Sequence, residues 1–584
     1  MITRRHTTTC CLFLAATLCW LFPTSAGAEV IGRASNVVPS TIQVSPAGDH
    51  VLFVSVDPKT NKRRVYVDGR ALPGVYDAIA EGTPIFSENG QHHAFVGTRG
   101  TECMVVLDGV EQTAYAMKEG GGWPITALLF GSGGTETHLA YIASKGDQHY
   151  VVVNGRAHGH YHSIDSKGNE KSALPGIWDL VLEGDYFAYR AKVGGVGKMA
   201  AFRGRIIGNE IKLTKSKDYD SIGAGSPVRM GGMLDAEGGE LFAFLAKDGP
   251  GKESIRQLPG DEPITKKDWK FIARDTLRAS PAQPGEMVYV AGEKQWQVFV
   301  GEKAWPPSER LGRLIASPSG ATWACMAKTD DKLVMMVNGV PGKVYSQIQH
   351  GETMFPAGDE RVVYGASTLD GSKTPARIVV DGKEGKAYTQ VKGDSVIFSA
   401  DKKSMAYVAG DGNKNFVVLD GAEGAKFDEI YDLRFSPVGS RLAYGARRGL
   451  EHFVVDGGKE LGPYENIQQG ALVFSPDGKA LAWAAFVDDG NWHVCVDGKM
   501  IDSGCDGIVS QITFPPGVSV PAYVGRYLSD GKTAFALSFG GEVGRQYNSI
   551  WMGDGGKLFV QEDGSIEYFA RSGGLLYRAV AKAE

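Results

Sequence analysis

Three histidines at alternate positions, His158, His160 and His162, form the most suggestive group of metal ligands in the sequence. Alternate side chains of a β-strand share one face, so these imidazoles could converge on zinc or copper. However, Tyr161 coincides with an aromatic residue that recurs along the chain, and this alignment places His158 and His160 in the turn before a strand. We therefore interpret the segment as an exposed histidine-rich turn, and we predict no metal and no cofactor.

A basic stretch is the second candidate for chemistry. From residue 190 to residue 217 the chain has eight basic residues and one acidic residue, Glu210, in a protein of net charge −5. Such a stretch could dock an anionic partner, such as a polysaccharide, a lipid headgroup or an acidic protein, or it could be a strand face whose charges are balanced across the sheet. The predicted partner-binding residues are Arg190, Lys192, Arg203, Arg205, Lys212, Lys215 and Lys217.

Motifs that would supply a catalytic centre are absent from the sequence. There is no Gly-x-Ser-x-Gly nucleophile elbow, no His-Glu-x-x-His zinc site and no Walker phosphate loop. The acidic run from Asp488 to Asn491 lacks the spacing and the distal glutamate of a calcium loop, so we predict a turn between strands there. We predict no catalytic residues and a protein that is not an enzyme.

Cysteines are few for so long a chain. Outside the N-terminal segment there are four, and they contain no Cys-x-x-Cys pair that would indicate a zinc site. Only Cys495 and Cys505 are close in sequence, on either side of a predicted hairpin, where one local disulfide would fit. The chain is therefore not a disulfide-based scaffold.

The elements that would carry these residues follow a repeat. Apolar runs ending in Asp-Gly or Asn-Gly recur, as at 378–382 and 494–498, and both dipeptides accept the positive φ of a tight hairpin turn. Between Gly339 and Gly498 these turns follow one another at intervals of 36 to 43 residues. Self-similarity at such a period is typical of repeat folds.

Two further elements accompany each of these turns. A Phe-Ser-Pro-Asp-Gly turn and an aromatic strand precede it, most clearly at 474–485. An aromatic residue with an aliphatic residue three positions later follows it, as in YDAI at 76–79 and FDEI at 427–430. Each unit of about forty residues therefore predicts a four-stranded antiparallel meander, which is one blade of a β-propeller.

The sequence contains twelve complete units and one incomplete unit. FRGR (202–205) and FVGE (299–302) occupy the place of the Asp-Gly turn in weaker copies, and residues 182–260 are expected to form two stretched units. Residues 558–580 have three strands but no fourth. We expect the missing strand to come from Val30–Val38, because such pairing closes a ring and leaves no sheet edge open.

Thirteen units exceed the four to eight blades of ordinary propellers. The fold class that we predict is therefore all-β, with two tandem propellers of six to seven blades each; a single open array is the alternative. The stiff segment from Trp305 to Ser308 is the best boundary. The expected domains are an N-terminal propeller at 29–305 and a C-terminal propeller at 306–584.

Residues 1–28 have the pattern of a signal peptide. Arg4 and Arg5 precede an apolar run at 11–22, and Ala26-Gly27-Ala28 forms a cleavage pattern. The apolar run is short for a membrane span, and an uncleaved anchor is the alternative. We expect cleavage after Ala28, a periplasmic or secreted protein, and no transmembrane segment in the mature chain.

Composition narrows the class of partner. The 62 basic and 67 acidic residues are nearly balanced, which disfavours a nucleic-acid binder. The 78 glycines amount to about twice the usual share, as expected of a chain with many tight turns. We therefore expect no nucleic acid among the partners.

The segment FSPDGKALAWAA at 474–485 resembles the WD-like propeller repeat of the TolB family, which also occurs in the propellers of prolyl-oligopeptidase-type peptidases. The resemblance covers most of the chain as repeats, and it implies the propeller fold. It does not extend to the separate α/β domain of TolB-like proteins or to a peptidase domain, for which the chain has no room.

Together these features predict an exported, non-enzymatic binding or scaffold protein with a protein or polysaccharide partner in the cell envelope. The alternative is an enzyme acting on glycans, a hydrolase or lyase, with its site in a propeller's central channel. Such a site would be assembled from several blades and would leave no local motif in the sequence.

Overall fold

The computed structural model describes the chain from Ala28 to Lys582 with short gaps. The described residues are 28–33, 36–131, 136–146, 148–162, 177–193, 198–208, 210–224, 227–234, 240–273, 276–283, 285–349, 355, 359–368, 374–552 and 556–582. Within these ranges the chain is built from β-strands, and its helical elements are short 3-10 turns. The predicted all-β class is confirmed.

In the described residues the strands form thirteen antiparallel sheets, which we number as blades 1 to 13 in chain order. Blades 1 to 3 consist of β2 (Gln43–Val44), β3 (Val51–Val56), β4 (Arg63–Val67) and β5 (Arg70–Ala71); of β6 (Ala78–Ile79), β7 (Ile85–Phe86), β8 (His93–Arg99), β9 (Glu102–Leu107), β10 (Val110–Glu111) and β11 (Tyr115–Ala116); and of β12 (Ile125–Phe130), β13 (Leu139–Lys145), β14 (Gln148–Val153) and β15 (Arg156–His162). Blades 4 to 6 consist of β16 (Ile177–Glu183), β17 (Tyr186–Lys192), β18 (Met199–Ile207) and β19 (Glu210–Lys215); of β20 (Ser221–Ile222), β21 (Val228–Leu234), β22 (Glu240–Lys247) and β23 (Glu253–Leu258); and of β24 (Phe271–Ile272), β25 (Arg278–Ala279), β26 (Met287–Gly292), β27 (Trp296–Val300) and β28 (Lys303–Ala304).

The second half of the chain continues the series. Blades 7 to 9 consist of β29 (Arg310–Leu311), β30 (Ile315–Ala316), β31 (Trp323–Thr329), β32 (Lys332–Val337) and β33 (Val340–Tyr345); of β34 (Gln347–Gln349), β35 (Val363–Ser367), β36 (Ala376–Val380) and β37 (Lys383–Glu384); and of β38 (Gln390–Val391), β39 (Ile397–Phe398), β40 (Met405–Asp411), β41 (Lys414–Leu419) and β42 (Ala422–Glu423). Blades 10 to 12 consist of β43 (Glu429–Phe435), β44 (Leu442–Arg448), β45 (Glu451–Asp456) and β46 (Lys459–Tyr464); of β47 (Asn466–Ile467), β48 (Val473–Phe474), β49 (Leu481–Phe486), β50 (Trp492–Val496) and β51 (Lys499–Met500); and of β52 (Gly507–Ile508), β53 (Ala522–Ser529), β54 (Lys532–Phe539) and β55 (Glu542–Val543). Blade 13 consists of β56 (Ser549–Trp551), β57 (Phe559–Val560), β58 (Ile566–Ser572), β59 (Leu575–Ala581) and β1 (Glu29–Arg33), and the 3-10 turns are η1 (Pro39–Thr41), η2 (Glu119–Gly121) and η4 (Gly393–Ser395).

The Asp-Gly turns have the geometry that the sequence predicts. Asp420 (φ 50°) and Gly421 (φ 86°) both adopt the left-handed conformation between β41 and β42. The Asp420 carboxylate also accepts a hydrogen bond of 2.8 Å from the backbone N–H of Met405, where β40 begins. Asp68, Asp108, Asn154, Asn338, Asp381 and Asp497 repeat this bond in their own blades. The side chain thus fixes the third and fourth strands of a blade to the start of the second.

The Ser-Pro turns are held in a similar way. The buried Ser475 hydroxyl donates to Asp477 at 2.6 Å and accepts from the backbone N–H of Ala480 at 2.9 Å. Ser399 makes the same pair of contacts with Asp401 and Ser404. In these two blades a local Ser-x-Asp hydrogen bond therefore sets the turn between the first and second strands.

Hydrophobic side chains join each blade to the next. We call each such contact a junction and number it by its two blades. Alternation along the strands gives every sheet two apolar faces, and the described residues form one hydrophobic cluster at each of the thirteen junctions. The cluster at junction 13/1 has the fewest buried members, Phe53 and Leu576.

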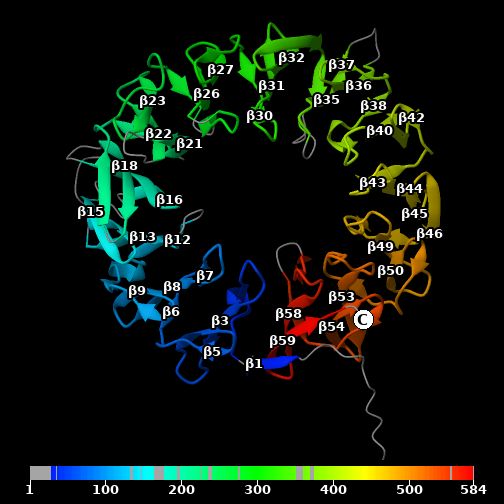
Figure 1. Ribbon diagram of the computed structural model, residues 1–584, viewed down its shortest axis with the longest axis horizontal. Helices are drawn as coiled ribbons and strands as arrows, with labels where there is room; N and C mark the ends of the chain where they lie inside the picture. The colour runs from blue at the N-terminus through cyan, green and yellow to red at the C-terminus, as the bar shows by residue number, and fades with distance from the viewer. Residues whose placement is uncertain are drawn as a thin grey trace, which may run out of the picture.

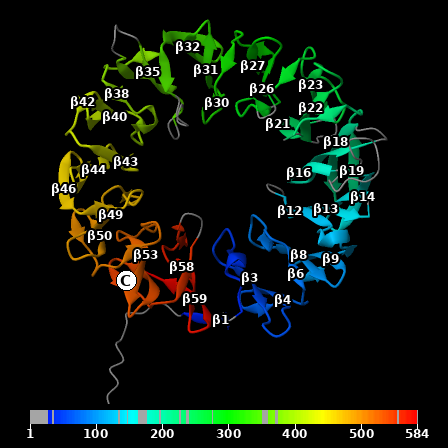
Figure 2. The same ribbon diagram turned by 180° about the vertical axis from the view of Figure 1, so that it is seen from behind.

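The N-terminal strand closes the ring. Strand β1 pairs with β59 in antiparallel register, from Glu29 opposite Arg578 to Arg33 opposite Leu575. The prediction that the incomplete last unit takes its missing strand from the N-terminal region is confirmed. In Figures 1 and 2 the blue N-terminal strand accordingly lies beside the red C-terminal ones.

The expected pair of tandem propellers is wrong, because the thirteen blades follow one another around a single ring (Figure 1). Trp305, expected at the boundary, is 2% exposed and packs in the cluster of junction 6/7 with Val298 of blade 6 and Trp323 of blade 7. Two separate propellers would instead need blade 6 to pack on blade 1. The number of blades in a ring depends on the small rotation at each junction, which no single repeat encodes.

One predicted turn is also misplaced. FRGR (202–205) lies inside β18, a strand of nine residues, and the hairpin turns at Gly208 (φ 55°) instead. The structure therefore assigns the stretched region to blades 4 and 5, and it moves Arg203 from a turn to the middle of a sheet. The FVGE segment does turn where the sequence predicts, at Gly301 (φ 54°).

Candidate functional site

The aromatic residue that recurs in the sequence after the outer strand of a blade, such as Tyr76, lies at the junction with the next blade. Tyr76 is fully buried and packs edge-on against Phe95 of blade 2, with ring centroids 5.2 Å apart. Its hydroxyl donates to Glu111, on the outer strand of blade 2, at 2.9 Å. At junction 4/5, Tyr219 donates to Asp261 at 2.7 Å in the same manner. At these two junctions the tyrosine of one blade thus fastens to an acid of the next.

Cations cover these aromatic rings. A guanidinium or ammonium group lies 4.0 to 5.4 Å from the ring centroid in five of the pairs, within the range of cation–π attraction. The pairs are Arg99 with Tyr76, Lys267 with Trp269, Lys386 with Tyr388, Arg448 with Phe427, and Arg545 with Tyr547.

The acid that follows the aromatic residue forms a second link between blades. Asp428 accepts from Lys414 of blade 9 at 2.5 Å and from the backbone N–H of Gly449 in blade 10 at 2.8 Å. These hydrogen bonds lower the pKa of the Asp428 carboxyl. Asp77 makes the equivalent contacts with Lys62 and Gly100 at junction 1/2.

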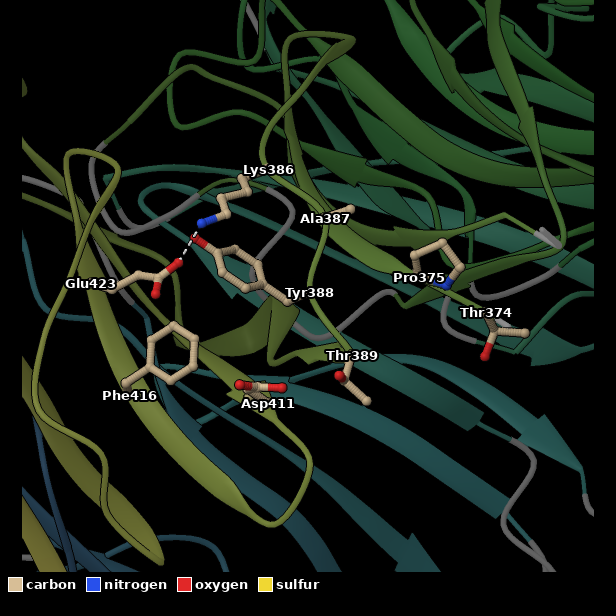
Figure 3. Close-up of a pocket in the computed structure, with 10 residues that line it drawn as sticks. Thr374, Pro375, Lys386, Ala387, Tyr388, Thr389, Asp411, Phe416 and Glu423 are labelled. Carbon is tan, nitrogen blue, oxygen red and sulfur yellow. Dashed lines mark hydrogen bonds and ion pairs between the residues drawn. The ribbon is translucent and has the colours of Figure 1, made fainter. Parts of the chain in front are cut away.

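At junction 8/9 these features border a cleft of about 710 Å³ (Figure 3). Its floor is buried and apolar, formed by Tyr388 from the end of blade 8 and by Phe416 of blade 9. Its walls carry exposed polar groups. The lining consists of Thr374, Pro375, Lys386, Ala387, Tyr388, Thr389, Gly410, Asp411, Phe416 and Glu423.

The charged groups of this cleft are arranged in pairs. Lys386 donates to Glu423 at 2.7 Å, and Lys426 donates to Asp411 at 2.9 Å. The first pair raises the pKa of Lys386 and lowers the pKa of Glu423, so both stay charged at neutral pH. Burial raises the pKa of Tyr388, which keeps its hydroxyl protonated. All three shifts move the pKa further from neutral pH.

A smaller cleft, of about 380 Å³, lies at junction 5/6. It uses the same repeat position, because Trp269 is the recurrent aromatic residue and the Lys267 ammonium lies 4.0 Å from its ring centroid. The floor continues onto Phe299 and Tyr289 of blade 6, whose stacked rings have centroids 4.9 Å apart. Burial raises the pKa of Tyr289 to about 12.

The structure brings part of the predicted basic surface together, but between two blades. Alternate residues of β17 and β18 place Arg190 and Arg203 on the face of blade 4 that packs on blade 5. Arg203 is 4% exposed and lies 5.1 Å from the Tyr186 ring centroid. Arg190 donates to Asp179 of its own blade and to the Ile222 carbonyl of blade 5 at 2.8 Å.

Lys192 and Arg205 share this face by the same alternation, and the three remaining lysines follow on or after the outer strand. Lys192 and Arg205 lie 5.9 and 5.6 Å from the rings of Trp178 and Tyr186. The exposed Lys212 is on the outer strand β19. Lys215 pairs with Asp218 at 2.5 Å, and Lys217 lies 3.9 Å from Asp261. A role of these residues in binding stays a prediction, and the geometry leaves the exposed part of such a surface to the lysines.

The histidine-rich segment forms the outer strand β15 and not a turn. His158 pairs with Val151 across the sheet, and burial lowers the pKa of its imidazole. The side chains of His160 and His162 lie outside the described residues. Within the described part of the chain, no group of three His, Cys, Asp or Glu side chains is placed to hold a metal ion.

The two neighbouring cysteines are free thiols in the structure. Cys495 packs toward blade 10 and Cys505 toward blade 12, on opposite sides of blade 11. The local disulfide that the sequence would allow is therefore not formed. The run from Asp488 to Asn491 is the turn between β49 and β50, as predicted.

A buried polar chain at junction 11/12 escaped the sequence analysis. His493 contacts Asp489 and Asp502, each at 2.9 Å, and Tyr523 of blade 12 donates to Asp502. The side chains of His493 and Asp502 are 7% and 2% exposed. The pKa of His493 is raised, because the two carboxylates outweigh the burial of the imidazole.

The cleft residues also escaped notice, although the sequence holds a signal for them. A basic residue stands two positions before the recurrent aromatic one at Lys217, Lys267, Lys343, Lys386 and Arg545. The partner acid of Lys386 is 37 residues further along the chain, in the next blade. Only the packing of blades shows that the two meet.

Comparisons with known proteins add little to this fold. No family profile matches the chain, and no curated protein matches its sequence. Solved structures with a similar course include a eukaryotic initiation factor (12% identity, 77% of this chain and 94% of that one, TM-score 0.21), TolB from Acinetobacter baumannii (11%, 62% and 86%, 0.19) and the Dos1 propeller (11%, 68% and 89%, 0.21). These TM-scores are too low to support an argument about the fold. The β-propeller repeat fold is established by the strand pairing of the chain itself. Membership of the TolB type stays a prediction.

No helix in the described ranges is both long and apolar enough to cross a bilayer.

Proposed function

We propose that the protein is an exported, non-enzymatic binding scaffold, periplasmic or secreted, whose ring of blades holds a protein or glycan partner of the cell envelope in its junction clefts. The signal-peptide pattern of residues 1–28 is the reason to place it outside the cytoplasm. A rigid ring with loops and clefts at its junctions is suited to such a role.

The cleft at junction 8/9 is the observation that carries this proposal. Its lining combines a buried aromatic floor with polar walls, as ligand sites do. General acid–base catalysis works best with a group whose pKa lies near the working pH. Here the pKa values of Lys386 and Tyr388 are raised and that of Glu423 is lowered, so all three lie further from neutral pH. These groups would therefore bind and orient a ligand without exchanging protons with it.

The experiment uses the mature chain, residues 29–584, immobilised and exposed to defined neutral oligosaccharides, acidic oligosaccharides and peptides. We expect at least one class to be retained and to be recovered chemically unchanged, as mass spectrometry would show. Recovery of a cleaved or unsaturated saccharide would overturn the non-enzymatic role in favour of a hydrolase or lyase. Retention of no class would overturn the binding role.

A further inference from the structure

The geometry points to the outer edge of blade 4, strand β19, as a docking site for an extended acidic segment of a partner protein, which adds to the blade as a fifth strand. The strand lies on the outer rim of the ring (Figure 2), and none of its residues lines a junction cleft described above. Three features lead to this inference: the regularity of the strand, the direction of its backbone groups, and the side chains along it.

Strand β19 is the most regular outer edge among the described residues. Its six residues pair with β18 one for one, from Glu210 opposite Ile207 to Lys215 opposite Phe202, without a bulge. An open edge is a template for another strand, and proteins usually blunt it by short length, bulges or prolines. The other twelve blades are blunted in these ways: β5, β10, β28, β37, β42, β51 and β55 have two residues each, β1, β15, β33 and β46 carry a register shift, and blade 5 has a single bridge at Pro263 in place of an outer strand.

The backbone of β19 presents hydrogen-bonding groups to the outside. In an antiparallel pair, successive residues point their N–H and C=O alternately toward the partner strand and away from it. The N–H of Ile206 donates inward to the Asp185 carbonyl at 2.8 Å, so Ile211, which lies opposite Ile206, points its groups away from β18. The same alternation directs Leu213 and Lys215 outward. No described residue pairs with this edge, so three successive outward positions can bind an added strand.

The charge of the edge favours an acidic partner. The exposed Lys212 lies opposite Arg205 of β18, and the exposed Lys215 lies on the other face of the strand. Lysines on an edge oppose pairing with a second copy of the same edge, because the like charges of the two copies would lie close together. A strand with carboxylates opposite Lys212 and Lys215 would be attracted instead.

The apolar side chains of β19 define the rest of the partner's pattern. Leu213 is 37% exposed and shares a face with Ile211, which packs against the cluster of junction 3/4. Lys212 lies on the opposite face. A segment with apolar residues opposite Leu213 and Ile211 and an acidic residue opposite Lys212 would therefore match both faces of the edge.

The test uses a labelled hexapeptide, Glu-Thr-Val-Glu-Val-Thr, whose binding to the mature chain is measured by fluorescence anisotropy. In antiparallel pairing its glutamates lie opposite Lys215 and Lys212, and its valines lie opposite Leu213 and Ile211. We expect binding that weakens as salt is added. N-methylation of both valines removes two N–H groups that point toward β19, and it should weaken binding by about fivefold or more, because two hydrogen bonds are lost.

Variants of the chain locate the site. Lys212→Glu should weaken binding of the acidic peptide and strengthen binding of the charge-reversed peptide Lys-Thr-Val-Lys-Val-Thr. Its matched control, Lys499→Glu, changes an exposed lysine of the outer strand β51 and should alter neither. Leu213→Pro removes one outward N–H and should weaken binding of the acidic peptide by about 2- to 10-fold, the usual value of one hydrogen bond. Thermal unfolding checks the fold, and Lys212→Glu decides the outcome if Leu213→Pro does not fold.

Equal binding of the acidic peptide by the wild type and by Lys212→Glu would place the peptide elsewhere and overturn the inference, as would equal binding of the N-methylated peptide. Absence of binding would also overturn it, while leaving the proposed role of the junction 8/9 cleft unaffected. Analytical ultracentrifugation of the mature chain tests the other occupant. A dimer that Leu213→Pro dissociates would assign the edge to a second copy of the chain and overturn the acidic partner.

Discussion

Junctions 8/9 and 4/5 are built from the same repeat but place their cations differently. At junction 8/9, Lys386 lies on the connection after the outer strand, where its ammonium reaches solvent and Glu423. At junction 4/5, Arg203 lies on the long strand β18, where its guanidinium is buried against Tyr186. The comparison teaches that the position of a basic residue within the blade, and not the local density of charge, decides whether it can meet a partner.

Trp305→Ala extends the comparison to junction 6/7, where the sequence predicts a break. We expect it to have the largest effect on stability of the variants proposed here. Trp305 is 2% exposed in a cluster shared by two blades. Removing so large a buried side chain should lower the free energy of unfolding by about 3 to 5 kcal/mol. Denaturant unfolding measures the loss. An effect below about 1 kcal/mol would indicate a linker and restore the two-propeller interpretation.

Arg203→Glu tests the buried half of the comparison. The substitution places a carboxylate inside junction 4/5, and we expect it to destabilise the chain by about 3 kcal/mol. Its matched control, Lys212→Glu on the exposed outer strand of the same blade, should cost less than about 1 kcal/mol. Denaturant unfolding of both variants decides the point. Similar stabilities would contradict the burial of Arg203.

Asp420→Ala addresses a feature of the regular blades that the stretched blade 4 lacks, the Asp-Gly turn after the third strand. The substitution removes the hydrogen bond to Met405 and places alanine at positive φ, so we expect a loss of about 1 to 2 kcal/mol. Asp420→Asn keeps the acceptor and tolerates this conformation, so it should cost clearly less. Thermal melts of the two variants, compared side by side, make the measurement, and equal losses would reject the role of the side chain.

The smallest effect concerns pH at junction 11/12. The pKa of His493 is raised in the folded chain above its usual value near 6.5. Its protonated form therefore stabilises the fold fully below pH about 6.5, and this contribution is lost as pH rises through the folded pKa. Unfolding of the wild type and His493→Gln across pH 5 to 9 should show their difference in stability shrinking as pH rises. A difference that grows with pH would contradict the raised pKa.

The local architecture could be predicted from the sequence because its causes are local. Asp-Gly turns such as Asp420-Gly421 and Ser-x-Asp turns such as Ser475 to Asp477 are fixed by residues next to one another. The pairing of β1 with β59 was predictable as well, since the last unit lacked a strand. The cleft was not, because Lys386 and Glu423 belong to different units.

By itself the sequence determined the strands of the regular blades, their order within each blade and the strand that closes the ring, because turn chemistry and alternation act over a few residues; the turns expected at FRGR and at the histidine-rich segment are strands. Only the tertiary structure decided that thirteen blades share one ring, that Arg203 is buried while Lys386 is exposed, and that Tyr388 borders a cleft. These depend on how each sheet packs and rotates against the next. That packing sums over many contacts between units, and no single repeat contains both sides of a junction.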